Sequence, residues 1–428
     1  MVLSTPRGRI HYGWIVVAVT FVTLLAAAGI RSAPGVLMIP LEREFGWTRA
    51  TVSFAVSINL FLYGLSGPFV AGLMDRRGIR RVMVVSLALV ATGVALTTVM
   101  TTSWQLALLW GVVVGLGTGT MASVLGAMVA NRWFTERRGL VLGLLTASSA
   151  TGQLLFLPLL ASMVVRLGWR SAVLLVAGVA LVVLPLVALL MRDDPRDVGL
   201  RPFGEPDGPI RPRPPRAAAG APLAGLALGL RSRDFWLLAG SFFICGLSTN
   251  GLIGTHLIPA SMEHGLPEVT AASLLALIGV LDIIGTTVSG WLSDRWDNRY
   301  LLCWYYGLRG LSLLFLPYAF GSAYLGLAAF VIFYGLDWVA TVPPTARLAA
   351  DTFGRENVGI MFGWIAASHQ LGAATAAYGG GLLRTWLGDY QVTFMSAGLV
   401  CLIAAGLVLR IGQVSRPMPA RSVEAAGA

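Results

Sequence analysis

The second half of this sequence repeats the first at a constant separation of 219 positions. Within Pro40–Thr51, four of twelve positions recur, where average composition would give roughly one. Matches farther away keep the same separation, so the register does not drift. The matched pairs are Gly35/Gly254, Ile39/Ile258, Pro40/Pro259, Glu44/Glu263, Gly46/Gly265, Thr51/Thr270, Asp75/Asp294, Arg76/Arg295 and Phe134/Phe353. The chain is therefore expected to fold as one structural unit used twice.

The repeated unit is too apolar to be solvated mainly by water. Hydrophobic residues make up 56% of the chain and charged residues 12%, whereas soluble proteins carry about 25% charged residues. A helix that spans a membrane needs about 20 apolar residues. Twelve segments reach that length: 12–36, 50–73, 81–99, 104–130, 138–161, 170–191, 235–259, 270–292, 300–319, 322–346, 358–380 and 391–411. These segments predict an all-α membrane protein with twelve transmembrane helices.

Six spans in each half predict two six-helix bundles with the same orientation, related by a pseudo-twofold axis along the membrane normal. The first bundle covers residues 1–191 and the second residues 235–411. Residues 192–234 are rich in proline and arginine and read as a linker, within which Leu223–Arg231 could form a short surface helix. Residues 412–428 form a tail. The first apolar run is long enough to span, so it reads as a retained anchor rather than a signal peptide.

The placement of arginine predicts the orientation of the spans. All 31 basic residues are arginines, and most lie at the termini, in the linker and in the loops on the same side. The opposite side carries Arg43, Arg49, Arg166, Arg170 and Arg384, while Arg31 and Arg309 lie inside spans. By the positive-inside rule, both termini are expected in the cytoplasm. A multi-pass protein of the plasma membrane, in a bacterium the inner membrane, is the expected setting.

Several function classes find no support in the residues. The chain has no lysine, so it cannot form a phosphate-binding loop of the Walker type, and no nucleotide is expected. Its net charge of +11 lies between apolar stretches rather than in a basic patch, so no nucleic acid is expected either. The three cysteines, Cys245, Cys303 and Cys401, lie within apolar stretches without metal-ligand spacing. No metal, cofactor or enzymatic activity is therefore predicted.

A loop motif follows the second and the eighth spans. Gly72, Asp75, Arg76 and Gly78 resemble the loop signature of the major facilitator superfamily, and Gly290, Asp294 and Arg295 repeat it in the second half. The resemblance covers essentially the whole chain and implies transport by alternating access. It also implies a cytoplasmic gate, in which Asp75 meets arginines near Arg132–Arg138 and Asp294 meets those near Arg347–Arg355 when that side is closed. The alternative is that these charges only cap helices and set topology.

The first span carries a narrower resemblance. Tyr12, Gly13 and Trp14, the run Gly29–Gly35, then Glu42, Phe45 and Gly46 resemble the monocarboxylate transporter family, and the oxalate/formate branch is also similar. That family carries a basic residue followed by serine in this span, implicated in handling the carboxylate, and Arg31 occupies the position. In the eighth span the family often has an aspartate followed four residues later by an arginine. Here the aspartate is Asp282 and the later residue is Thr286.

Charged residues deep in the spans are the strongest functional candidates, because a charge at the bilayer centre costs at least about 2.5 kcal/mol. Counting from the loops at 1.5 Å per residue puts Asp282 level with Arg309, and Asp337 level with His369. We expect these two pairs to form and to carry protons. The alternatives are a structural ion pair that locks the eighth span to the ninth, and a histidine satisfied within the core.

Arg31 is the candidate for binding an anionic substrate, since its guanidinium presents a fork that matches a carboxylate; the alternative is an arginine that reaches to the outer surface. Its repeat counterpart is Asn250, which symmetry places across the cavity. Weaker substrate-site candidates, for which packing is the alternative, are Tyr63, Trp110, Thr118 and Tyr334. His256 is expected at the membrane interface.

Together these features predict a secondary transporter that acts as a monomer in the lipid bilayer and moves a small organic anion, such as a monocarboxylate, together with protons. One alternative is a proton-antiport exporter of amphipathic compounds, which would not need the arginine. Another is a receptor or scaffold built on a transporter fold, which would have little reason to keep buried titratable groups.

Overall fold

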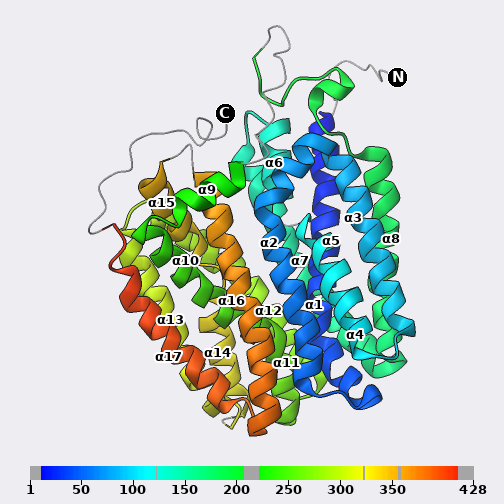
Figure 1. Cartoon of the computed structure of the whole chain (residues 1–428), viewed down its shortest axis with the longest axis vertical. Coiled ribbons are helices and arrows are strands. Elements are labelled where there is room, and N and C mark those ends of the chain that lie inside the picture. The colour runs from blue at the N-terminus through cyan, green and yellow to red at the C-terminus, as the bar shows by residue number, and fades with distance from the viewer. Residues whose placement is uncertain (1–10, 122, 207–220, 322, 355–357, 413–428) are drawn as a thin grey trace.

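The computed structural model describes residues 11–412 apart from 122, 207–220, 322 and 355–357, and this part of the chain is almost entirely helical (Figure 1). The first half contains α1 (Tyr12–Phe45), α2 (Arg49–Arg77), α3 (Ile79–Leu96), α4 (Ser103–Leu106), η2 (Ala107–Val114), α5 (Gly115–Gly119), α6 (Ser123–Trp133), α7 (Arg138–Leu167) and α8 (Trp169–Leu190). The second half contains α10 (Arg233–Gly246), η4 (Leu247–Ile253), α11 (Gly254–Glu263), α12 (Glu268–Ser293), α13 (Asn298–Ala319), α14 (Ala323–Asp337), α15 (Val342–Phe353), α16 (Val358–Leu387) and α17 (Gln391–Val408).

Because α4 to α6, α10 to α11 and α14 to α15 each form one run, the described residues make twelve long helical runs. Ten of them are long and apolar enough to cross a membrane. The other two are α13, which carries Arg299 and Arg309, and α16, which is rich in glycine and polar residues. The all-α membrane architecture predicted from the sequence is confirmed.

Glycines and capping side chains account for where the helical runs begin and end. Gly46 ends α1 with a φ of 67°, a left-handed conformation that glycine adopts without a steric penalty. Two residues later, Thr48 caps α2 by accepting a hydrogen bond from the backbone N–H of Thr51 at 3.2 Å. Asp297 caps α13 in the same way through the N–H of Arg299, and its hydrogen bond with the Arg299 guanidinium lowers the pKa of the Asp297 carboxyl.

The two halves meet at repeat-related positions. They lie side by side in Figure 1, with α1 to α8 on the right and α10 to α17 on the left. A Cβ added at Gly35 of α1 would lie 3.4 Å from the carbonyl oxygen of Gly254, its repeat counterpart in α11. Equivalent residues touch one another only beside a twofold axis, so the pseudo-symmetry axis passes between these two helices.

The packing between α7 of the first half and α12 of the second differs between the two ends of the molecule. We call the end at which α1 begins the linker end, uppermost in Figure 1, and the opposite end the distal end. Toward the distal end, α7 and α12 bury apolar side chains such as Leu157 and Leu275. Toward the linker end, α12 buries only Gly285, Ser289 and Ser293. Ser289 donates to the Ala340 carbonyl within the second half. Near the same end, α2 and α16 still join the halves, with the rings of Phe69 and Trp364 5.8 Å apart.

The linker is attached to both halves. Phe203 donates its backbone N–H to the Trp133 carbonyl at 2.8 Å and accepts from the N–H of Thr135, also at 2.8 Å. This holds the start of the linker against the end of α6. The short helix α9 (Ala221–Gly229) lies close to the predicted Leu223–Arg231, and Trp364 of α16 donates to the carbonyl of Pro222. Residues 207–220, which lie outside the described part, join these two attached segments of the linker.

Candidate functional site

A cavity of about 70 Å³ lies between the halves, near the middle of the bundle. Both halves contribute to its wall. The polar residues that line it are Arg31, Ser32, Asn59, Tyr63, Gln153, Asn250, Thr255 and Gln370. A small space with several hydrogen-bonding groups around it is the arrangement that a small polar solute requires.

Arg31 enters this cavity from α1 with part of its hydrogen-bonding capacity unused. Its Nη1 donates to the Tyr63 hydroxyl at 3.2 Å, and its Cζ lies 5.4 Å from the centre of the Tyr63 ring. Its Nε is buried and has no hydrogen-bond partner among the described residues. A buried, permanently charged donor without a partner costs free energy unless a ligand supplies an acceptor, so the position of Arg31 suits an anion.

The opposite wall comes from the second half. Asn250 lies on η4, a π-helical segment of a kind often found at functional sites. Gln370 of α16 also faces the cavity, and its Oε1 is buried without a partner among the described residues. The structure thus brings together three of the sequence candidates, namely Arg31, Tyr63 and Asn250. Sequence reasoning missed Gln370, because a lone glutamine in a glycine-rich helix gave no signal.

The other three substrate-site candidates do not line this cavity. Trp110 and Thr118 are buried, and Thr118 donates to the Val114 carbonyl of its own helical run. Tyr334 is buried too, and its hydroxyl donates to the Ser248 carbonyl at 2.7 Å. Trp110 only supports the wall from behind, because its carbonyl accepts from the Asn59 side chain. These positions follow the packing alternative, since all three side chains are buried outside the cavity.

The buried charges pair differently from the prediction. Arg309 donates through Nε to Asp337 Oδ2 at 2.7 Å, so the predicted pairs Asp282–Arg309 and Asp337–His369 are wrong. The His369 ring lies 4.8 Å from that of Phe242. Asp282 instead accepts from Thr286 at 2.8 Å, the residue at which the sequence departs from the family pattern. Counting residues from the loops indicates how deep each residue lies in the membrane, but it does not indicate which way the side chain points around the helix. The predicted pairs therefore failed.

A break in the helical run explains this pairing. Helix α14 ends at Asp337 and α15 begins at Val342, so backbone groups between them lack helical partners. Arg309 Nη2 donates to the carbonyls of Asp337 and Trp338, at 2.5 and 3.2 Å. Asp282 Oδ1 accepts from the N–H of Val339 at 2.8 Å. The two buried charges therefore cap a broken helix, as the hydrocarbon interior requires.

The break also connects these charges to the cavity. Trp338, within the break, lines the cavity that holds Arg31. One oxygen of Asp337, Oδ1, is buried without a hydrogen-bond partner among the described residues. Transporters often hold substrates and coupling ions at broken helices between their repeats. Here Asp282, Asp337 and Arg309 lie at the break, and Trp338 within the break lines the cavity.

One known protein family matches most of this chain. A family model described as the Major Facilitator Superfamily matches residues 19–347. The chain belongs to the major facilitator superfamily. The resemblance inferred from the loop motif and from the repeat is therefore confirmed.

Relatives within the superfamily span almost the whole chain. An uncharacterized transporter of this type from Bacillus subtilis is 25% identical and covers 94% of both chains. Monocarboxylate transporter 13 of Bos taurus is 26% identical, over 94% of this chain and 89% of its own length. Human monocarboxylate transporter 11 is 28% identical, over 95% and 84%. These three relatives are named as transporters rather than enzymes.

Solved structures show the same superfamily fold. A bacterial homologue of the human lysosomal transporter Spinster has a TM-score of 0.74 at 13% identity, covering 94% of this chain and 97% of its own. A D-xylose-proton symporter has a TM-score of 0.72 at 14% identity, covering 94% and 98%.

The superfamily loop motif makes ion pairs within each half. Asp75 pairs with Arg132 in the first half, and Asp294 lies 4.0 Å from Arg347 in the second. Arg295 stacks on Trp291, with Cζ 4.2 Å from the ring centre. Arg76 is exposed, and a Cβ on Gly72 or Gly290 would meet open space. The predicted partners are thus adjacent, and each pair stays within one half.

A second polar cluster, which we call the distal network, closes the other end of this superfamily fold. Arg49 pairs with Glu42 of its own half and with Glu263 of the other half at 3.2 Å. Arg384 pairs with Glu263 at 2.9 Å. Tyr390 accepts from Arg49 Nη1 at 2.5 Å. This network joins the halves directly across the distal end.

His256 belongs to the distal network rather than to the membrane interface, so that prediction is wrong. Its side chain is fully buried, with Nδ1 3.1 Å from the Tyr390 hydroxyl and Nε2 2.8 Å from the Ala377 carbonyl. Sequence reasoning missed the network because Arg49 and Arg384 looked like ordinary loop charges. A signal was present nonetheless, since Glu263 is one of the repeated residues.

Proposed function

We propose that this protein is a secondary transporter that moves a small organic anion, of the monocarboxylate class, together with protons by alternating access. The observation that carries the proposal is the guanidinium of Arg31 in a cavity between the two halves, whose buried Nε has no hydrogen-bond partner among the described residues. A carboxylate would accept from Nε and Nη in the paired geometry that arginine favours. Two relatives named monocarboxylate transporters support the same substrate class.

The size of the cavity favours a small solute over the alternative of an amphipathic compound. Sites for drug-sized ligands usually enclose about 300–1,000 Å³, whereas this cavity measures about 70 Å³. Its wall also places amide groups of Gln153, Asn250 and Gln370 near the arginine. Such a site suits a carboxylate with few carbon atoms.

The broken helix supports the coupling of anion movement to protons. Asp282 accepts from the N–H of Val339, and Asp337 pairs with Arg309, which itself donates to carbonyls of the break. The other carboxylate oxygen of Asp337, Oδ1, has no hydrogen-bond partner among the described residues. Protonation of either acid would weaken its charge-assisted hydrogen bonds and so loosen the break beside Trp338. Proton binding would then change the wall of the anion cavity, as coupled transport requires.

The arrangement of the halves supports a conformation that opens at the linker end. The distal network joins the halves at one end, whereas toward the linker end α12 buries only small residues. We assign the linker end to the cytoplasm, because arginines accumulate in the linker and adjoining loops. Both termini would then be cytoplasmic, in a bacterial inner membrane.

The transport proposal is tested with purified protein in liposomes. We expect a small radiolabelled carboxylate to accumulate when an inward proton gradient is imposed, and Asp337→Asn or Asp282→Asn to reduce this proton-driven uptake at least about tenfold. Counterflow exchange without a gradient should fall less, because it does not need net proton movement. Unchanged proton flux in both variants would remove the acids from the mechanism, and absence of carboxylate uptake by the unmodified protein would remove the proposed function.

The distal network gives a separate prediction about conformation. Arg49→Gln leaves Glu42 and Glu263 facing each other without their shared cation, and should favour opening at the distal end. We expect a cysteine introduced at Ser32, which lines the cavity, to react at least about fivefold faster with an impermeant maleimide added from the distal side. That factor corresponds to about 1 kcal/mol.

Arg43→Gln is the matched control for Arg49→Gln, because Arg43 is an exposed arginine at the same end of the molecule. Labelling of the protein without the Ser32 cysteine is subtracted, since the three native cysteines are buried or half-buried. Equal rates in the Arg49 and Arg43 variants would mean that the network does not hold this end closed.

A further inference from the structure

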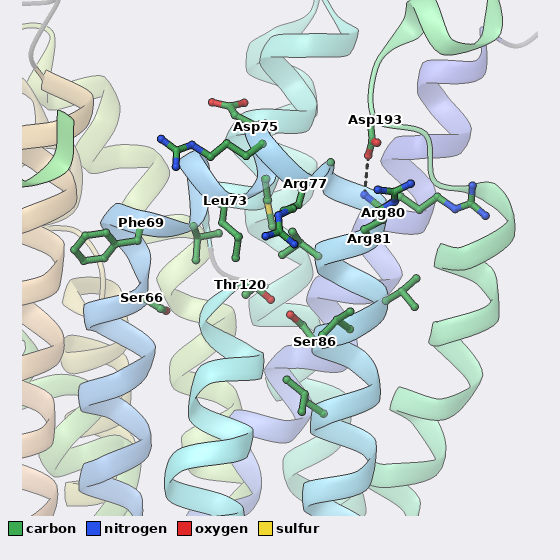
Figure 2. A pocket seen from close by; sticks show the side chains of 18 of the residues that line it. Ser66, Phe69, Leu73, Asp75, Arg77, Arg80, Arg81, Ser86, Thr120 and Asp193 are labelled. Carbon is green, nitrogen blue, oxygen red and sulfur yellow. Dashed lines mark hydrogen bonds between the residues drawn. The ribbon is translucent and has the colours of Figure 1, made fainter. Parts of the chain in front are cut away.

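A groove of about 1280 Å³ lies at the linker end of the first half, apart from the central cavity. Its walls come from α2 and α3, with contributions from α5, α6 and the end of α8. Figure 2 shows Arg77, Arg80 and Arg81 gathered at its upper part, above Ser86 and Thr120. The groove is far too large for the anion that suits the central cavity.

The basic groups of this groove exceed its acidic groups, and most of them have no carboxylate partner among the residues that the structure describes. Five arginines line it, namely Arg76, Arg77, Arg80, Arg81 and Arg132, against Asp75 and Asp193. Asp75 pairs with Arg132, while Asp193 accepts at 2.7 Å from the backbone N–H of Arg80 rather than from its side chain. No described carboxylate lies within ion-pair distance of the other four guanidinium groups. They are exposed and available to an external anion.

Each of the two main walls changes from basic to apolar with depth. On α3, Arg81, Val85 and Leu89 follow one another at intervals of four residues, and therefore share one face of the helix. On α2, Arg77, Leu73 and Phe69 do the same in the reverse chain direction. The apolar positions thus lie about 6 and 12 Å deeper than the arginines.

These apolar side chains are so exposed that contact with water would cost free energy. Val85 is 58% exposed, Leu73 and Leu89 are each 45% exposed, and Leu116 is 44% exposed. Lipid chains would cover them at the depth of the hydrocarbon layer, while the arginines lie at the level of the headgroups. The groove therefore has one end suited to phosphate and another suited to acyl chains.

We propose that this groove binds an anionic phospholipid from the membrane leaflet at the linker end. Its phosphate lies on Arg77, Arg80 and Arg81, and its acyl chains lie on the apolar faces of α2 and α3. A soluble phosphate compound would use only the basic end and would leave Leu73, Val85 and Leu89 uncovered. The proposal does not depend on which solute the central cavity carries.

The test compares lipids on the purified, delipidated full-length protein. We expect phosphatidylglycerol to bind and to raise the thermal unfolding temperature, whereas phosphatidylcholine at the same concentration has a much smaller effect. Arg77→Gln, Arg80→Gln and Arg81→Gln combined should weaken phosphatidylglycerol binding at least about 30-fold, since each basic residue near an anionic lipid adds to the attraction. Native mass spectrometry gives the bound fraction.

The matched control removes the same charge from the same end of the second half, with Arg231→Gln, Arg233→Gln and Arg410→Gln, three exposed arginines outside the groove. Binding within about twofold of the unmodified protein is expected. An equal loss in both triple variants would overturn the proposal in favour of general attraction to surface charge. Equal binding of phosphatidylglycerol and phosphatidylcholine would overturn it as well.

A second pair of variants tests the apolar part, and it decides the matter even if the arginine variant folds poorly. Leu89→Trp fills the groove and should weaken lipid binding at least about fivefold, while Leu174→Trp, at an exposed leucine of α8, should not. Glycerol 3-phosphate and inorganic phosphate should compete only weakly. If either competes as well as the lipid, or if the two tryptophan variants behave alike, the groove is a phosphate site and not a lipid site.

Discussion

Arg31→Gln is expected to weaken binding of a small carboxylate to the purified protein by at least about 30-fold. The change removes a cation whose buried Nε has no hydrogen-bond partner in the described part of the chain, and loss of one side of a buried charge pair costs at least about 2 kcal/mol, which is about 30-fold in affinity. The same loss should appear in transport, because the substrate would meet only neutral amide and hydroxyl groups. Isothermal titration or thermal stabilisation by a panel of small acids measures the effect.

Three controls separate charge, geometry and packing at this position. Arg31→Lys keeps the charge but lacks the fork of donors, so an intermediate loss is expected. Tyr63→Phe removes the hydroxyl that accepts from Arg31 and should change affinity only a fewfold. Arg43→Gln, on the exposed end of the same helix, should leave affinity unchanged. Full retained affinity in Arg31→Gln would take the arginine out of the binding site.

Arg309→Leu is expected to destabilise the protein by about 3–5 kcal/mol, the cost of leaving one buried partner of an ion pair alone. Arg309 is fully buried and contacts the Asp337 carboxylate together with the carbonyls of Asp337 and Trp338. Its removal strands all three acceptors within the helix break. The measurement is the yield of folded protein and its thermal unfolding temperature in detergent.

The double variant Arg309→Leu with Asp337→Leu distinguishes an ion pair from a helix cap. If the carboxylate were the only group stranded, removing it would restore stability almost fully. Because the two carbonyls would remain without donors, we expect only partial recovery, and Arg309→Lys should fall between the extremes. Arg410→Leu, an exposed change in the same half, should stay within about 0.5 kcal/mol. Full recovery in the double variant would contradict the capping role.

The architecture was predictable from the sequence because it follows from patterns along the chain and does not require knowing which residues are in contact. Spans follow from the length of apolar runs, and the pseudo-symmetry follows from a repeat with constant register. The contact between Gly35 and Gly254 expresses that register in space. The wall of the cavity was predictable in part, through the charge of Arg31 and its symmetry partner Asn250.

The pairing of the buried charges was not predictable in the same way. Counting residues gives the depth of a side chain, but each residue also turns by 100° around the helix, so neighbours at one depth can face different directions. The break between Asp337 and Val342 added a second difficulty. It exposes carbonyl and N–H groups that attract Arg309 and Asp282, and nothing in an apolar run with few polar residues signals such a break.

The distal network was missed for a different reason. Its charges lie near the ends of spans, where charged side chains are common and usually solvated. Only the folded arrangement brings Arg49 of one half to Glu263 of the other. Contacts between residues more than 200 positions apart are a property of the packed bundle, and neither spacing nor composition encodes them locally.

The distal network also shows how a duplicated chain departs from its own symmetry. A twofold axis makes two copies of every contact, and the copy of Arg49–Glu263 would join the residues 219 positions away, Glu268 and Glu44. Both are acidic, and Glu44 is instead engaged by Trp169 and Arg170 within its own half. Among the described residues, the distal end therefore has an ion pair between the halves on one side of the axis and no equivalent ion pair on the other. When the ion pair breaks, the first gap should form on the side that lacks one, which makes the motion a rotation about one edge rather than an even separation.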